Sequence, residues 1–147
     1  MEIRELLPSE KDYINDIAVY EENIFGDGGI GIWTIMPFVR YGKVYVLLED
    51  EEIVSVAEIM RAFDAKEAYI YGFFTKEKFL KKGYGSVLLD FIIKEMRNCG
   101  IDTVTLTVDP ENTKAVALYL KHGFEKAGLL EEEYGKNEDR LYMRIGL

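Results

Sequence analysis

Residues 79–92 read FLKKGYGSVLLDFI and join a basic loop to an apolar helix. Apolar side chains recur at helical spacing from Val87 onward and predict a helix that runs from Gly83 to Cys99. Two glycines, Gly83 and Gly85, stand in its first turn, although each glycine weakens a helix by about 1 kcal/mol relative to alanine. Their presence directly behind two lysines calls for an explanation.

The start of this predicted helix has the features of an anion-binding site. The first N–H groups of a helix have no partner within the helix, and they lie at the positive end of its dipole. Glycine removes the Cβ that would keep a phosphate away from them, and Lys81 and Lys82 add positive charge. The alternative is that Gly83 and Gly85 only shape a surface turn. Neither a P-loop ending nor a dinucleotide fingerprint is present.

Strands and helices alternate around this stretch. Strands are predicted at residues 2–7, 43–50, 52–63, 67–75 and 101–108, in part of 124–134, and at 139–147. Helices are predicted at residues 8–25, at 32–42 with an interruption at Pro37, at 83–99 and at 112–123. Gly72, alone within a strand, indicates a bulge or a close backbone approach. The order of elements predicts one α/β domain with a mixed sheet.

Composition limits the classes of partner. The chain has 147 residues and a net charge of −9, which disfavours nucleic acid and anionic membranes and favours a cationic or amine-bearing partner, unless the charge serves solubility alone. Cys99 is the only cysteine and His122 the only histidine, so neither a disulfide nor a soft-metal site is expected. With no apparent signal sequence, we expect a cytoplasmic protein.

A second motif follows at residues 112–124, which read NTKAVALYLKHGF. Asn112 and Tyr119 are two helical turns apart, with Ala115 between them on the same face. A polar group, a small residue and a phenol in this arrangement can face a groove together. Alternatively, Asn112 only caps the helix and Tyr119 is a core tyrosine.

Together the two segments resemble the GNAT superfamily of N-acetyltransferases. The acetyl-CoA motif of that family, [Arg/Gln]-x-x-Gly-x-[Gly/Ala], is similar to LKKGYG at 80–85, and its Asn-x-x-Ala-x-x-x-Tyr-x-Lys-x-Gly-Phe motif is similar to residues 112–124. Leu80 stands where the family has Arg or Gln, so that side-chain contact is absent. The resemblance covers residues 43–145 well. It implies a three-layer α/β/α sandwich around a mixed, mostly antiparallel sheet with a splayed central strand pair, as a single domain over residues 1–147.

The resemblance also implies a set of site residues. Acetyl-CoA would be the cosubstrate, with no metal, and Tyr119 would be the general acid that protonates the leaving thiolate. The cofactor contacts it implies are Phe73, Phe74, Thr75, Lys81, Lys82, Gly83, Tyr84, Gly85, Ser86, Asn112, Ala115 and Tyr119.

The general base is harder to assign. Glu58 is a charged residue within an apolar strand, SVAEIM, and is our candidate; the alternative is that it lies on an exposed strand face. Asp109 and Glu111 are weaker candidates.

Substrate binding is expected at Trp33, Glu58 and Tyr134. The stretch FGDGGIGIWTIMPFVRYG places Trp33 and Phe38 beside glycines, as in a loop that covers a substrate. A packed helical hairpin would instead use the same aromatic residues as core.

We expect an acetyl-CoA-dependent N-acetyltransferase that acts on a primary amine of a small molecule, peptide or protein by direct attack. The alternative functions are a non-catalytic acyl-CoA-binding or sensing module on the same fold, and a scaffold that binds partners through its edge strands. Pairing of the last strands between two copies would give a homodimer.

Overall fold

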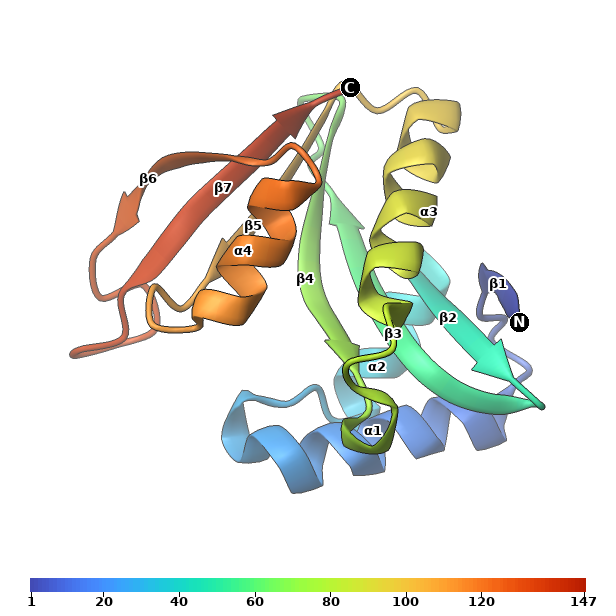
Figure 1. Cartoon of the computed structure of the whole chain (residues 1–147). Coiled ribbons are helices and arrows are strands. Elements are labelled where there is room, and N and C mark those ends of the chain that lie inside the picture. The colour runs from blue at the N-terminus through green and yellow to red at the C-terminus, as the bar shows by residue number, and fades with distance from the viewer. The chain divides into compact units, whose positions relative to one another are not determined.

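A computed structural model describes residues 1–147, with the strands and helices labelled in Figure 1. The strands are β1 (Glu2–Glu5), β2 (Lys43–Glu49), β3 (Glu52–Arg61), β4 (Glu67–Thr75), β5 (Thr103–Val108), β6 (Glu125–Leu130) and β7 (Arg140–Gly146). The helices are α1 (Lys11–Phe25), α2 (Ile32–Tyr41), α3 (Tyr84–Asn98) and α4 (Thr113–Lys121), with short 3₁₀ turns η1 (Gly26–Gly28) and η2 (Glu77–Phe79). The strands form a mixed sheet in the order β1-β2-β3-β4-β5-β7-β6. The predicted α/β class is confirmed.

The chain divides into two compact units. The first comprises residues 1–60 and 72–88, and the second comprises residues 61–71 and 89–147. Strand β4 and helix α3 each contribute residues to both. None of the helices combines the length and the apolar character that crossing a membrane requires.

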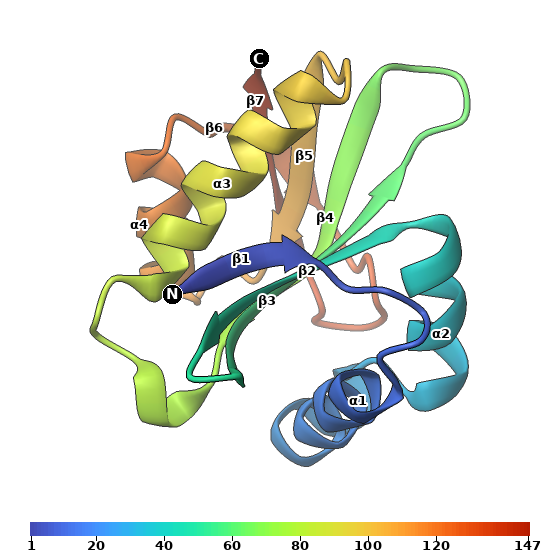
Figure 2. The same ribbon diagram turned by 90° about the vertical axis from the view of Figure 1, so that its right-hand side faces the viewer.

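The first unit is built on the β2–β3 hairpin. Asp50 and Glu51 form its turn with φ of 48° and 66°, the left-handed conformation that matches the twist of paired strands. Strand β1 adds to β2 in antiparallel register, and α1 and α2 lie on the same side of the hairpin (Figure 2). Their buried faces join the strands in one apolar cluster of Leu6, Ile14, Ile17, Ala18, Ile30, Ile35, Phe38, Val39, Val44, Val46, Leu48, Ile53 and Val56.

The predicted interruption at Pro37 is wrong. Helix α2 continues through this residue from Ile32 to Tyr41. Proline removes one backbone donor, and the carbonyl that loses its partner belongs to Trp33, four residues earlier. Because Trp33 is exposed, solvent can reach this part of the helix, and packing of the opposite face keeps the helix intact.

In the second unit, β4 and β5 pair in parallel from Glu67 opposite Thr103 to Ile70 opposite Leu106. The pairing ends there, although β4 continues to Thr75. This early end fits the expected splay of a central strand pair. Strand β7 pairs antiparallel with β5 and with β6, which leaves β6 at the edge of the sheet.

Candidate active site

The start of α3 has the geometry of an anion cradle. Gly83 has a φ of 82°, which glycine adopts without strain, and a Cβ placed on it would meet no heavy atom within 4 Å. The first bond of the helix runs from the N–H of Val87 to the carbonyl of Gly83, at 3.2 Å. The helix therefore supplies no acceptor to the N–H groups that precede Val87. Gly83 thus shapes the turn and leaves open the space that a Cβ at this position would occupy.

The basic loop keeps part of its charge available. Lys76 is buried and its Nζ lies 2.9 Å from Asp16, while Lys78 forms an ion pair with Glu52. The lysines at 81–82 are exposed and form no ion pair. Two positive charges thus stand free of acidic partners beside the start of α3, where an anionic ligand would benefit from them.

Tyr84, the first residue of α3, extends its side chain along the loop. Its hydroxyl donates to the carboxylate of Glu49 at 3.3 Å, and its ring meets that of Phe79 edge to face at 6.2 Å. Desolvation raises the pKa of the Tyr84 phenol, and the neighbouring carboxylate of Glu49 raises it further. The side chain is therefore anchored within the first unit.

The end of β4 uses two of its side chains for packing. The ring of Phe74 stacks on Tyr20 with 5.5 Å between centroids, and the hydroxyl of Thr75 shares a hydrogen bond of 2.6 Å with Ser55. Contacts of these two residues with a cofactor would thus involve mainly their backbone groups.

Glu58 lies on β3 and is fully buried, at 0% exposure. A Cβ on Gly72 would collide with Oε1 of Glu58, so the glycine in β4 is explained by the close approach of this carboxyl group. The alternative that Glu58 lies on an exposed strand face is wrong. Burial, with Glu21 nearby, raises the pKa of Glu58 to about 10.

Sequence reasoning missed Glu21, a residue of α1 that is 4% exposed. Its Oε1 accepts a long hydrogen bond of 3.5 Å from the N–H of Ile30, and burial raises the pKa of its carboxyl group. A signal was present, because Glu21 continues the helical stripe of Ile14 and Ile17, where an apolar residue is expected.

In the second unit, Asn112 is the N-cap of α4. Its Oδ1 accepts from the N–H of Ala115 at 3.3 Å, which is the capping role considered as the alternative. Tyr119, two turns later, is 7% exposed and its ring meets Phe124 edge to face at 5.6 Å. Burial raises the pKa of Tyr119 above its usual value of 10, so the phenol stays protonated at neutral pH.

A group of hydroxyls near the end of the β4–β5 pairing was also missed. Tyr69 shares a hydrogen bond of 2.7 Å with Thr107, and burial is the main cause that raises its pKa to about 12. Tyr134, one of the predicted substrate residues, interacts with Tyr69. The guanidinium of Arg140 lies over the ring of Tyr134, 5.2 Å from its centroid.

Trp33 lies in the first turn of α2 and is 92% exposed. The alternative that this tryptophan forms part of a helical core is therefore wrong, whereas Phe38 on the same helix is buried in the apolar cluster. An exposed tryptophan next to the glycine-rich turn remains available to a partner.

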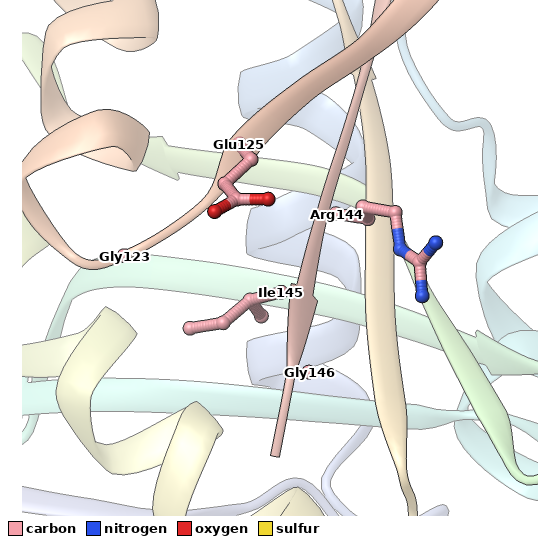
Figure 3. A pocket seen from close by; sticks show the side chains of 5 residues that line it. All are labelled: Gly123, Glu125, Arg144, Ile145 and Gly146. Carbon is pink, nitrogen blue, oxygen red and sulfur yellow. The ribbon is translucent and has the colours of Figure 1, made fainter.

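The second unit has a hollow of about 430 Å³ lined by Gly123, Glu125, Arg144, Ile145 and Gly146 (Figure 3). Arg144 and Ile145 are neighbours on β7 and point in opposite directions (Figure 3). None of the predicted site residues lines this hollow, so it does not enter the account of catalysis.

The sequence is similar to known acetyltransferases over most of its length. The model of the acetyltransferase (GNAT) family matches residues 7–124. A [Ribosomal protein bS18]-alanine N-acetyltransferase of Salmonella typhimurium is 28% identical over 114 residues, which cover 74% of this chain and 76% of that protein. The enzyme of that name from Escherichia coli is 30% identical over 74 residues, or 50% of each chain.

Solved structures share the fold. Ard1 from Thermoplasma volcanium matches 99% of this chain and 97% of its own with a TM-score of 0.84 at 22% identity. A ribosomal-protein-alanine N-acetyltransferase from Brucella melitensis matches 100% of both chains with a TM-score of 0.83 at 21% identity. A GNAT family acetyltransferase from Elizabethkingia anophelis with acetyl-CoA bound has a TM-score of 0.80 at 18% identity and covers 99% of this chain and 97% of its own.

The family match extends over most of the chain and includes both the glycine-rich start of α3 and the motif of α4. The prediction of an acetyl-CoA-dependent N-acetyltransferase with an amine-bearing acceptor is confirmed. The chain belongs to the GNAT family of acetyltransferases.

Proposed function

We propose that this chain acetylates the N-terminal α-amino group of a polypeptide, with an N-terminal alanine as the preferred acceptor. The observation that carries the proposal is the match to the alanine N-acetyltransferase of Salmonella typhimurium over about three quarters of both chains. The net charge of −9 supports an acceptor with a positive amine and basic neighbours. An acceptor of the ribosomal class would place the reaction in the cytoplasm.

The start of α3 fits the anionic part of acetyl-CoA. The open space before Gly83 and the exposed lysines at 81–82 would accept a pyrophosphate, and the backbone at the end of β4, residues 73–75, would accept the extended arm. Bound acetyl-CoA supplies the thioester carbonyl that the amine attacks. Asn112 caps α4, so its contribution would be to fix the helix on which Ala115 and Tyr119 lie.

Tyr119 is the proposed general acid. Its burial keeps the proton on Oη at any pH near neutrality, which is the state that a proton donor to a leaving thiolate needs.

Glu58 is the proposed general base and depends on pH. With a pKa of about 10, its carboxyl group is mostly protonated at neutral pH and accepts a proton only in its ionised fraction. Activity should therefore rise with pH as Glu58 loses its proton.

Trp33 and Tyr134 are proposed to contact the acceptor chain, because both are large aromatic residues with exposed surface, at 92% and 58%. A homodimer through the edge strand β6 stays a prediction, which sedimentation of the purified chain would test.

The function is tested with acetyl-CoA and three acceptors: a basic peptide with an N-terminal alanine, the same peptide with a blocked N-terminus and an internal lysine, and a polyamine. Release of free thiol and the peptide mass are measured. We expect acetylation of the first peptide at its α-amino group. Acetylation of the blocked peptide or of the polyamine alone would reject the proposed acceptor. Binding of acetyl-CoA without any turnover would support a sensing module.

A further inference from the structure

Two carboxyl groups, those of Glu21 and Glu58, lie within hydrogen-bonding reach of each other in the interior of the first unit. Glu21 of α1 is 4% exposed and Glu58 of β3 is 0% exposed. Three of their four carboxyl oxygens, Oε2 of Glu21 and both of Glu58, accept no hydrogen bond from the chain. The fourth, Oε1 of Glu21, accepts the bond of 3.5 Å from Ile30. Unsatisfied buried oxygens are rare and costly, so these three require an explanation.

The backbone is shaped around the two residues. A Cβ on Gly72 would collide with Oε1 of Glu58, and a Cβ on Gly29 would lie 2.5 Å from the carbonyl oxygen of Glu21. Glycine at both positions lets the main chain approach these residues on two sides. Such close packing leaves the pair within the interior rather than in contact with bulk solvent.

The surroundings provide no compensating positive charge. Val44 of β2 lies opposite Glu58, Gly72 of β4 lies beside it, and the other buried residues of α1 are apolar. Burial and Glu21 are the causes that raise the pKa of Glu58, and no cationic side chain acts on it. Two ionised carboxylates in contact here would repel one another without the screening of water, so at most one of the two is ionised at a time.

We propose that Glu21 and Glu58 share a single proton, and that Glu21 is a positioning residue that acts through Glu58. The proton resides on Glu58, because Ile30 donates to Glu21 and thereby favours its ionised form. The O–H of Glu58 donates to Oε2 of Glu21, which has no other donor. The unsatisfied oxygen of Glu21, Oε2, and one of the two oxygens of Glu58 then gain a partner within the pair.

For the reaction, this pair means that Glu21, in addition to burial, raises the pH at which Glu58 becomes ionised. This consequence rests on the proposed function, in which Glu58 accepts the proton of the acceptor amine. The sharing of the proton itself requires no turnover.

The direct test is a ¹³C NMR titration of the chain with glutamate labelled at Cδ, from pH 4 to 11, without acetyl-CoA. One resonance, absent in Glu58→Gln, should titrate far above the ordinary range of glutamate. In Glu21→Gln its midpoint should fall by about one to three pH units, because the like charge is removed. Glu22→Gln, an exposed neighbour on α1, is the matched control and should leave the midpoint unchanged.

Glu21→Asp keeps the charge and should retain a high midpoint, so it tests the proposal if Glu21→Gln fails to fold. The proposal is overturned if every glutamate titrates near its ordinary pKa, or if removal of the charge at Glu21 leaves the Glu58 midpoint unchanged.

A second readout is the pH profile of kcat/KM, which Glu21→Gln should move to lower pH, whereas a purely structural role would lower the whole profile without moving it. If no acceptor is acetylated at any pH, the proposed function fails while the NMR titration still decides the proton sharing.

Discussion

Tyr119 in the second unit and Glu58 in the first are both buried, and burial raises the pKa of both. The shared cause has opposite consequences for their proposed roles. A phenol with a raised pKa stays protonated, which is the state a general acid needs, whereas a carboxyl group with a raised pKa stays protonated when a general base should be ionised. In the proposed mechanism, burial therefore keeps the acid protonated at every working pH, whereas it leaves the base mostly protonated and makes it the group that limits activity near neutrality.

The largest effect is expected on turnover when Tyr119, the proposed acid, is replaced. Tyr119→Phe should lower turnover about 100-fold or more, because a positioned proton donor contributes on that order. Affinity for acetyl-CoA should change little, because the aromatic ring is retained. Steady-state kinetics and calorimetry measure the two quantities. Tyr41→Phe is the control, since Tyr41 is 89% exposed. Equal turnover of Tyr119→Phe and the native chain would remove Tyr119 from the acid role.

The protonation of Glu58, the proposed base, is tested by the pH dependence of the free energy of unfolding. The pKa of Glu58 is about 10 in the folded chain and near 4.5 when unfolded, so the folded state binds more protons between these values. Its contribution to stability is complete below pH 4.5 and is lost as the pH rises towards 10. The free energy of unfolding, measured with urea, should therefore decrease less between pH 5 and pH 10 for Glu58→Gln than for the native chain. Parallel curves for the two proteins would show that Glu58 is not held protonated by the fold.

Binding of acetyl-CoA should depend on the backbone at the start of α3 and not on the protonation of Glu58 or Tyr119. Gly83→Ala should weaken acetyl-CoA binding about tenfold, because its Cβ would stand before the N–H groups of α3 and its φ of 82° disfavours alanine. Gly100→Ala is a matched control, with a φ of 78° and no heavy atom near its Cβ. The two variants should lose similar stability in urea while only Gly83→Ala loses affinity in calorimetry. An equal affinity of both would reject the cradle.

The smallest expected effect is a gain in affinity for acetyl-CoA. Leu80 is 51% exposed and stands where the family has arginine or glutamine. Leu80→Arg should raise the affinity for acetyl-CoA a few-fold, since one charge-assisted contact at an exposed position contributes about 0.5–1 kcal/mol. Leu80→Met, which adds no charge, should bind like the native chain. A gain in both variants would mean that charge is not the cause.

Much of the fold could be predicted because its signals are local. The hairpin of β2 and β3, the strand β4 and the helix α3 follow from alternation, helical spacing and glycine stops. Pro37 misled the prediction of α2, because tertiary packing outweighs a local helix breaker at that position. Gly72 was correctly associated with a close approach, but the sequence could not show that the approaching group is Glu58.

The candidate site was less predictable. Glycine spacing indicated the start of α3, and the motif of α4 indicated Tyr119. The burial of Glu58 and its neighbour Glu21 depends on how α1 packs on β3, which no local pattern encodes. The hydrogen bond between Tyr69 and Thr107 likewise joins two strands that are distant in the sequence.

The most direct test of the account is an amide NMR titration of the chain with coenzyme A. We predict saturable binding at one site per chain, with the largest shifts in the N–H groups of residues 82–86, at the start of α3. Shifts that leave these amides unchanged and concentrate elsewhere, or the absence of any binding, would contradict the backbone cradle on which the proposed chemistry depends.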